Sequence, residues 1–231
     1  MNFFQRIEQK YVLSESEFLI LFEKIKEYIE KDKYFKSTVC NIYFDNDCDD
    51  LIVKSLEKPV YKEKVRIRSY NTPNINDSVF LELKGKYKGV VFKRRVEIQL
   101  NELYKYIDTG IMPNVSNMQI MKEIDYIIKK YDLKPKIYLA YDRLSFYDKN
   151  DMNFRITFDS NLRSRNDCLK LEYGDSGNLY NKNKFYIMEL KSLTAIPLWF
   201  IKILSELKIY PKSFSKYGNI YSKNKEVRIN V

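Results

Sequence analysis

The sequence predicts an α+β protein in which eight antiparallel strands close into a β-barrel and helices pack against its outside. Two observations support this prediction. Strand-length segments alternate apolar and charged residues, which is the pattern of strands with one covered face. Four other segments repeat apolar residues at helical spacing, so each has one apolar side that must be covered. Eight antiparallel strands can close into a barrel that leaves no exposed edge.

The chain begins with a predicted strand over residues 3–13. Ser14 then has the character of a helix N-cap, and Glu17 three positions later completes a capping box. Apolar residues continue at helical spacing to about Glu30, so we expect the first helix to extend that far.

The rest of the chain divides into further strands and helices separated by turn-forming residues. The connections 71–77 and 85–89 have the Pro, Asn and Gly content of hairpin turns, and 46–50 reads as a short acidic turn. A polar loop is expected at 175–184, and the tail 211–218 reads as a loop as well. The predicted strands are 38–45, 61–70, 78–86, 89–100, 136–147, 152–162 and 185–193, and the predicted helices are 101–108, 117–131 and a short one after Pro197.

Composition limits the class of protein and of chemistry. We expect the 231 residues to form one domain, since no linker, repeat or low-complexity tract divides them. The net charge of +10 favours a polyanionic partner such as a phosphate compound, a nucleic acid or an anionic membrane surface. The chain contains no histidine, which excludes Ser-His-Asp and Cys-His catalysis and imidazole metal sites.

Cysteine usage and the amino terminus predict a reduced, cytoplasmic protein. The three cysteines, Cys40, Cys48 and Cys168, are odd in number and lack metal-ligand spacing. The first residues contain no apolar signal core, and no run is long enough to predict a membrane span.

Cations gather on one face of the predicted strands. In the segment 61–70, Lys64, Arg66 and Arg68 share a face, while Val65 and Ile67 share the other. In a single strand this pattern usually indicates a solvated sheet face, but six strands of the chain repeat it. If the apolar faces meet the helices, the charged faces turn into the barrel, and such an interior must be wet, cross-paired or filled by an anion. A phosphate chain is the occupant that we expect.

Motifs along the chain resemble those of the VTC (vacuolar transporter chaperone) domain, a family of the triphosphate tunnel metalloenzyme, or CYTH-like, superfamily. The resemblance covers about residues 4–221 and depends on the order and number of motifs that are weak individually. These motifs are Arg6-Ile7-Glu8-Gln9-Lys10-Tyr11, Arg66-x-Arg68, Glu82-Leu83-Lys84, Lys93-Arg94-Arg95, Tyr141-x-Arg143, Arg155-Ile156-Thr157-Phe158-Asp159, Glu189-Leu190-Lys191 and Ser213-Phe214-Ser215-Lys216-Tyr217-Gly218.

The resemblance implies a tunnel that binds ATP or another triphosphate together with inorganic polyphosphate, and a polymerase that extends the polyphosphate with the γ-phosphate of ATP. It also implies a divalent metal, Mn²⁺ or Mg²⁺, with Glu189 as its principal ligand. The resemblance further suggests a membrane-associated protein partner. The residues expected to carry catalysis are Lys10, Arg66, Arg68, Lys84, Arg143 and Lys216, and those expected to bind substrate are Glu8, Lys93, Arg95, Tyr141, Arg155 and Ser215.

Two alternatives to the polymerase stay open at this stage. Hydrolytic members of the superfamily carry Glu-x-Glu-x-Lys on the first strand, and this chain has Arg6 at the first position, which favours chain binding over a metal-dependent triphosphatase. A binding module without turnover is the second alternative. Nucleic acid is not an expected ligand, because stacking platforms are few on the predicted inner face. The eukaryotic relatives carry a phosphate-sensing domain and membrane spans that we do not expect in this chain.

Overall fold

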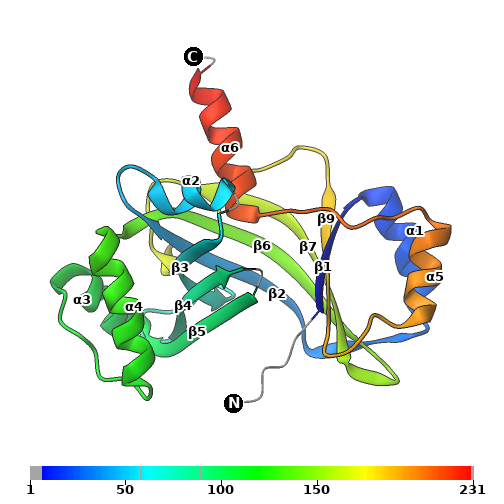
Figure 1. The fold of residues 1–231 in the computed structure, drawn as a ribbon, viewed down its shortest axis with the longest axis horizontal. Coiled ribbons are helices and arrows are strands. Elements are labelled where there is room, and N and C mark those ends of the chain that lie inside the picture. Colours follow the sequence, from blue (N-terminus) through cyan, green and yellow to red (C-terminus); the bar gives the residue numbers. More distant parts are fainter. Residues whose placement is uncertain (1–6, 58, 89, 230–231) are drawn as a thin grey trace. The chain divides into compact units, whose positions relative to one another are not determined.

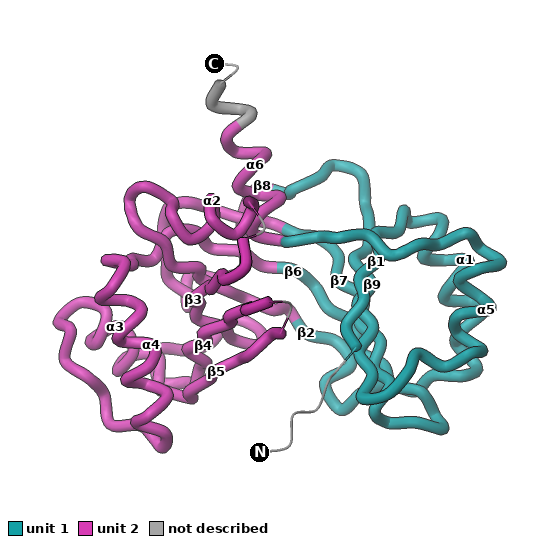
Figure 2. Tube along the Cα trace, viewed as in Figure 1, with its two compact units in different colours: residues 1–37, 141–162, 179–215 teal, residues 38–140, 163–178, 216–231 magenta. Residues whose placement is uncertain are grey.

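The computed structural model describes residues 7–57, 59–88 and 90–229. The chain divides into two compact units, which Figure 2 shows in different colours. Unit 1 contains residues from 1–37, 141–162 and 179–215, and unit 2 contains residues from 38–140, 163–178 and 216–231. The predicted residues 3–6 of the first strand, with Arg6, lie outside the described ranges.

Strands and helices follow one another along the chain as Figure 1 shows, and several strands contribute residues to both units. The strands are β1 (Ile7–Ser14), β2 (Ile29–Asp45), β3 (Tyr61–Tyr70), β4 (Ser78–Tyr87), β5 (Val90–Gln99), β6 (Lys134–Asp148), β7 (Asp151–Arg165), β8 (Asn178–Leu179) and β9 (Phe185–Ser192). The α-helices are α1 (Glu15–Ile25), α2 (Asp50–Leu56), α3 (Leu100–Thr109), α4 (Met118–Tyr131), α5 (Leu198–Glu206) and α6 (Lys216–Ile229), and a 3₁₀ turn covers Leu171–Tyr173.

The strands pair in the order β1-β9-β7-β6-β2-β3-β4-β5, with β8 added to β7. This order begins at β1 and ends at β5, so the predicted closed barrel is not confirmed. Closure would require a ladder of backbone hydrogen bonds between these two end strands. The prediction of an α+β protein with a large antiparallel sheet is confirmed.

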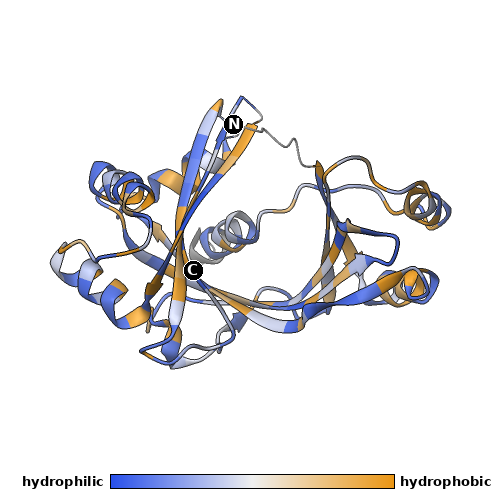
Figure 3. Ribbon diagram, turned by 90° about the horizontal axis from the view of Figure 1, so that it is seen from below, coloured by the Kyte–Doolittle hydropathy of each residue, from blue (hydrophilic) through white to orange (hydrophobic). Residues whose placement is uncertain are grey.

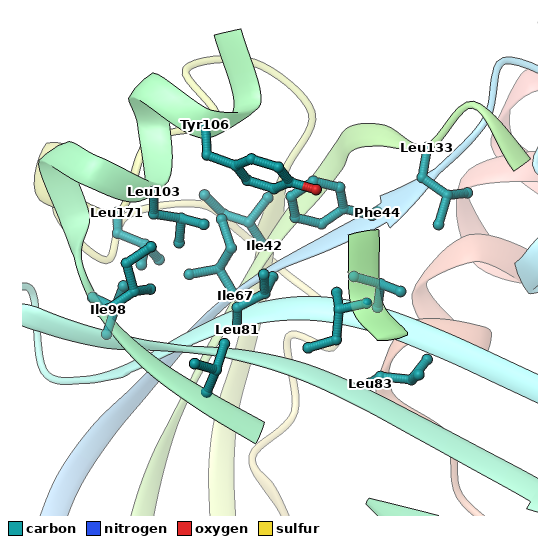
Figure 4. Packing of buried hydrophobic residues seen from close by; sticks show 14 of the residues in the cluster. Ile42, Phe44, Ile67, Leu81, Leu83, Ile98, Leu103, Tyr106, Leu133 and Leu171 are labelled. Carbon is teal, nitrogen blue, oxygen red and sulfur yellow. The ribbon is translucent and has the colours of Figure 1, made fainter. Parts of the chain in front are cut away.

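In unit 2, helices α3 and α4 cover the apolar face of strands β3, β4 and β5. Ile67, Leu81 and Ile98 contribute one fully or nearly buried side chain from each strand, and Leu103 and Tyr106 of α3 pack onto them (Figure 4). Burying one such aliphatic side chain stabilises the fold by about 1.5–3 kcal/mol. Figure 3 shows hydrophilic and hydrophobic residues alternating along the strands. Because successive side chains of a strand point to opposite faces, the charged side chains lie on the face away from these helices.

In unit 1, helices α1 and α5 cover the apolar face of β1, β7 and β9. Phe18 of α1 stacks on Tyr186 of β9 at 3.8 Å between ring centroids and meets Phe158 of β7 edge-on at 5.0 Å. Phe200 of α5 is fully buried in the same core. The predicted capping box is confirmed, since the Ser14 hydroxyl accepts from the Glu17 backbone N–H and the Glu17 carboxylate accepts from the Ser14 N–H.

Two local predictions were wrong, and helix α2 was not predicted. The first helix ends at Ile25 instead of about Glu30, and Ile29 starts β2 while still packing into the core of α1. The acidic turn 46–50 leads into helix α2, where the Asp45 carboxylate accepts from the backbone N–H groups of the first turn at 2.9 and 3.0 Å. The tail at 211–218 becomes helical at Lys216.

None of the helices in the described ranges has both the length and the apolar character that crossing a bilayer requires.

Candidate functional site

Four cations converge on one buried carboxylate in unit 2, and we call this set the Glu82 cluster. Arg66 lies directly opposite Glu82 on the neighbouring strand β3, and both its Nε and its Nη2 lie 2.8 Å from Glu82 Oε2. Lys93 Nζ lies 2.5 Å from Oε1, and Arg68 Nε and Arg95 Nη1 lie at 3.9 and 4.0 Å from the carboxylate. Four positive charges and one negative charge give these five side chains a net charge of +3.

Burial and charge act against each other on the two central groups of this cluster. Burial alone would raise the pKa of Glu82, but Arg66, Arg68 and Lys93 outweigh it and lower the pKa to about 2. Burial lowers the pKa of Lys93, its pair with Glu82 opposes that change, and the two arginines add to it. Glu82 is therefore ionised at neutral pH, and the cluster still has an excess of positive charge that an anion can balance.

Sequence reasoning missed Tyr43, which belongs to the same cluster. The Tyr43 hydroxyl accepts from Arg66 Nη1 at 3.0 Å, and Tyr43 lies opposite Arg66 in the β2–β3 register. Burial would raise the pKa of Tyr43, but Arg66, Arg68 and Lys64 outweigh it and lower the pKa to about 8. The signal for Tyr43 is its alternation with two apolar residues of its strand, Ile42 and Phe44.

Aromatic rings accompany the arginines more often than the sequence predicted. Arg95 lies 3.6 Å from the centroid of the Phe80 ring, and Arg66 lies 5.8 Å from that of Tyr43. In unit 1, Arg143 lies 5.3 Å from the ring centroid of Tyr141. Rings at these distances stabilise guanidinium groups and hold their planes in place.

Lys84 and Lys216 also belong to unit 2. Lys84 lies in register with Lys64 on one side and Lys93 on the other, which adds a row of cations beside the Glu82 row. Lys216 is the first residue of α6, and the next residue, Tyr217, packs against Tyr43 with 4.8 Å between ring centroids. Tyr217 therefore connects the start of α6 to the ring that contacts Arg66.

Unit 1 contains a second charged group, which we call the Arg143 cluster. Arg143 Nε and Nη2 donate to the two oxygens of Asp159 at 2.6 and 2.8 Å, and Nη2 lies 3.8 Å from Glu189 Oε2. Burial would lower the pKa of Arg143, but Tyr141, Asp159 and Glu189 keep it well above its usual value. Lys191 Nζ lies 3.3 Å from the other oxygen of Glu189.

The remaining predicted residues of unit 1 lie around this cluster or pair elsewhere. Lys10 lies opposite Glu189 in the β1–β9 register, and its Nζ lies 4.0 Å from Glu8 and 3.4 Å from the Phe214 carbonyl, next to Ser215. Arg155 pairs with Asp32, and its side chain is 51% exposed.

The oxygen atoms around Glu189 suit a divalent cation that also binds phosphate oxygens. Thr157 lies opposite Glu189 in the β7–β9 register, and its buried hydroxyl has no hydrogen-bond partner among the described residues. Asp159 follows on the same face, so two carboxylates and a hydroxyl offer only oxygen ligands, which Mg²⁺ and Mn²⁺ prefer. The described residues contain no group of three acidic or thiol side chains that could hold an ion alone, so phosphate oxygens and water would have to complete the coordination.

Comparisons with known proteins find similar sequences and similar folds. The family model of the VTC domain matches residues 5–224. The vacuolar transporter chaperone complex subunit 4 of Schizosaccharomyces pombe is 24% identical over 165 residues, which cover 62% of this chain and 22% of that protein. The subunit 4 of Trypanosoma brucei is 28% identical over 155 residues, which cover 55% of this chain and 20% of that protein. The chain thus spans about a fifth of the length of these relatives.

Two solved structures have a similar fold. A Bacillus halodurans protein described as a candidate adenylate cyclase has a TM-score of 0.58 at 16% identity, covering 91% of this chain and 93% of that one. The PH1819 protein of Pyrococcus horikoshii has a TM-score of 0.50 at 19% identity, covering 94% and 99%. At these identities the likeness concerns the fold alone.

Proposed function

Because this chain belongs to the VTC domain family, we propose that it is a phosphotransferase that moves the γ-phosphate of ATP onto the end of a polyphosphate chain. The single observation that carries the proposal is the Glu82 cluster, where three arginines and a lysine surround one buried carboxylate. A protein needs this excess of fixed positive charge to bind a polyanion, and phosphoryl transfer needs mainly positioning and charge neutralisation.

The Glu82 cluster binds phosphate oxygens in this proposal. The guanidinium groups of Arg66 and Arg68 present paired N–H donors that match phosphate oxygens, while Lys93 supplies a compact charge. Glu82 holds these cations in place before substrate arrives, since it contacts Arg66 through two donors. The phosphate oxygens then interact with cations that Glu82 already holds in position, so no rearrangement of these side chains has to precede binding.

The Arg143 cluster contributes the metal-binding carboxylate in the same proposal. Glu189 would hold the Mg²⁺ or Mn²⁺ ion together with phosphate oxygens, with Asp159 and Thr157 beside it. The ion would supply neutralisation of the charge that develops on the transferred phosphoryl group. Arg143 orients both carboxylates by contacting each of them, and Lys10 faces Glu189 from β1.

The proposal also includes a protein partner and a location in the cell. The named relatives are subunits of a vacuolar transporter chaperone complex, which supports a protein partner for this chain as well. We also propose that the protein is cytoplasmic.

Incubation with ATP and Mn²⁺ or Mg²⁺ tests the function directly. A polymerase produces long-chain polyphosphate, measured by gel electrophoresis, whereas a triphosphatase releases inorganic phosphate and a binding module produces neither. The double variant R66A/R68A should lose triphosphate binding by at least about a hundredfold, since each charged hydrogen bond contributes about 1.5–3 kcal/mol. The matched control is R94A, which removes an arginine that points to the other face and pairs with Glu123.

A second variant tests the role of the metal. Glu189→Gln removes the charge of the proposed ligand with little change in shape, so metal-dependent turnover should be lost while polyphosphate binding is largely kept. Turnover that persists in E189Q with an unchanged metal dependence would rule Glu189 out as the ligand.

A further inference from the structure

Glu63 is a buried carboxylate on the apolar side of the sheet. It lies on β3 between Tyr61 and Val65, on the face opposite Arg66 and Arg68, and only 3% of its surface is exposed. A carboxylate at such a position is costly unless it finds hydrogen-bond donors or a cation. The phosphate-binding proposal makes no use of Glu63, since the Glu82 cluster occupies the other face of the strand.

The two oxygens of Glu63 have unequal surroundings. Oε2 accepts from the Tyr61 hydroxyl at 2.6 Å, whereas Oε1 is buried and has no hydrogen-bond partner among the described residues. A buried acceptor without a donor destabilises the folded chain, and more so when it is charged. A ligand that supplies a donor at Oε1 would recover this free energy.

A surface pocket of about 660 Å³ lies beside this carboxylate, where β3 and β4 meet α4. Its volume is in the usual range for small-molecule sites. Leu83 and Ile127 provide apolar surface, and the phenol rings of Tyr61 and Tyr126 can face a cation. The full lining consists of Tyr61, Glu63, Leu83, Gln119, Lys122, Glu123, Tyr126 and Ile127.

We propose that this pocket binds a small organic cation, a primary ammonium or guanidinium group carried on a short apolar stem. The Glu63 carboxylate would accept from the cationic head, and the stem would lie against Leu83 and Ile127. Such a head carries only hydrogen-bond donors, and Oε1 has no donor in the described part of the chain. Because Oε1 has no exposed surface, the head reaches it by displacing neighbouring side-chain atoms.

Two neighbouring contacts support a cation over an anion. Lys130 of α4 already places its ammonium over the rings of Tyr131 and Tyr126, at 4.9 and 5.9 Å from their centroids, so this surface accommodates an alkylammonium. Glu123 is paired with Arg94 at 2.9 Å. Glu63 interacts with Lys130 electrostatically, but Oε1 of Glu63 still has no donor among the described residues, so Glu63 is the carboxylate that we expect to anchor the ligand. Lys122 lines the same pocket at an exposed position, where water screens its repulsion.

The test is a titration of the full chain with n-butylammonium and n-butylguanidinium, followed by calorimetry and by the methyl NMR signals of Leu83 and Ile127. n-Butanol and pentanoate are the matched neutral and anionic probes. We expect a cationic probe to bind at least about tenfold more tightly than butanol, and Glu63→Gln to remove that preference. Glu57→Gln changes an exposed carboxylate of the same unit and should leave binding unchanged.

Equal binding of butanol and butylammonium would overturn the proposal, as would a cation preference that survives in E63Q or shifts that avoid both methyl groups. If E63Q fails to fold, the wild-type comparison of charged and neutral probes still decides. Triphosphate binding is followed in the same samples: its loss would concern the Glu82 cluster, while loss of cation binding alone would concern this pocket.

Discussion

Replacing Glu82 by glutamine removes the one negative charge at the centre of four cations, and the effect on stability should depend on pH. The pKa of Glu82 lies at about 2 in the folded chain against an ordinary value of 4.5. A change of that size corresponds to about 3 kcal/mol of stability from the ionised carboxylate. Solvent screens the Glu82 carboxylate little, since its side chain is 1% exposed.

The direction of the pH effect follows from the lowered pKa. Above pH 4.5 the carboxylate is ionised in both the folded and the unfolded chain, so its full contribution is present there. The contribution is lost as pH falls from about 4.5 through about 2, where the folded form takes up the proton. E82Q should therefore be less stable than the wild type by about 3 kcal/mol at neutral pH and nearly equal to it below pH 2.

Urea unfolding at a series of pH values, followed by circular dichroism, measures this difference. Glu97→Gln is the matched control, because Glu97 is an exposed carboxylate on the next strand, in register with Phe80. E97Q should follow the wild type within about 0.5 kcal/mol at every pH. A gap between E82Q and the wild type that is the same at pH 7 and at pH 2 would refute the assignment of Glu82 as the ionised centre of the cluster.

Two further predictions follow from other contacts. The pKa of Tyr43 is about 8, so above that pH its phenol becomes negative beside Arg66. The affinity of the wild type for inorganic triphosphate should therefore fall several-fold between pH 7 and pH 9, and Y43F should abolish this decrease. Calorimetry at both pH values measures the affinities, and an identical decrease in Y43F would contradict the prediction. Ser14→Ala removes the hydroxyl that caps α1 and should cost about 1 kcal/mol in urea unfolding. Ser205→Ala, an exposed change on α5 of the same unit, should cost less, and an equal loss in both would show that the capping box adds nothing.

Prediction from sequence succeeded where a pattern depends on neighbours along the chain. The alternation over 61–70 correctly placed Val65 and Ile67 on the apolar face and Arg66 and Arg68 on the other, and the predicted strand has the bounds of β3. It failed where a side chain outside a segment decides the conformation of that segment. Asp45, for example, caps the first turn of α2 through its side chain, and the residues 46–50 by themselves do not predict that helix.

The amino-acid sequence by itself determined which residues face the cores, the excess of cations on the opposite face and the membership of the VTC domain family, because each depends on residue type and spacing alone. Only the tertiary structure decided that Glu82 is the centre of four cations, that Tyr43 contacts one of them and that Oε1 of Glu63 has no donor among the described residues. The physical reason is that register between strands sets these distances. Register comes from packing and hydrogen bonding between strands that are far apart in the sequence, so the residues adjacent to a given residue in the chain do not determine it.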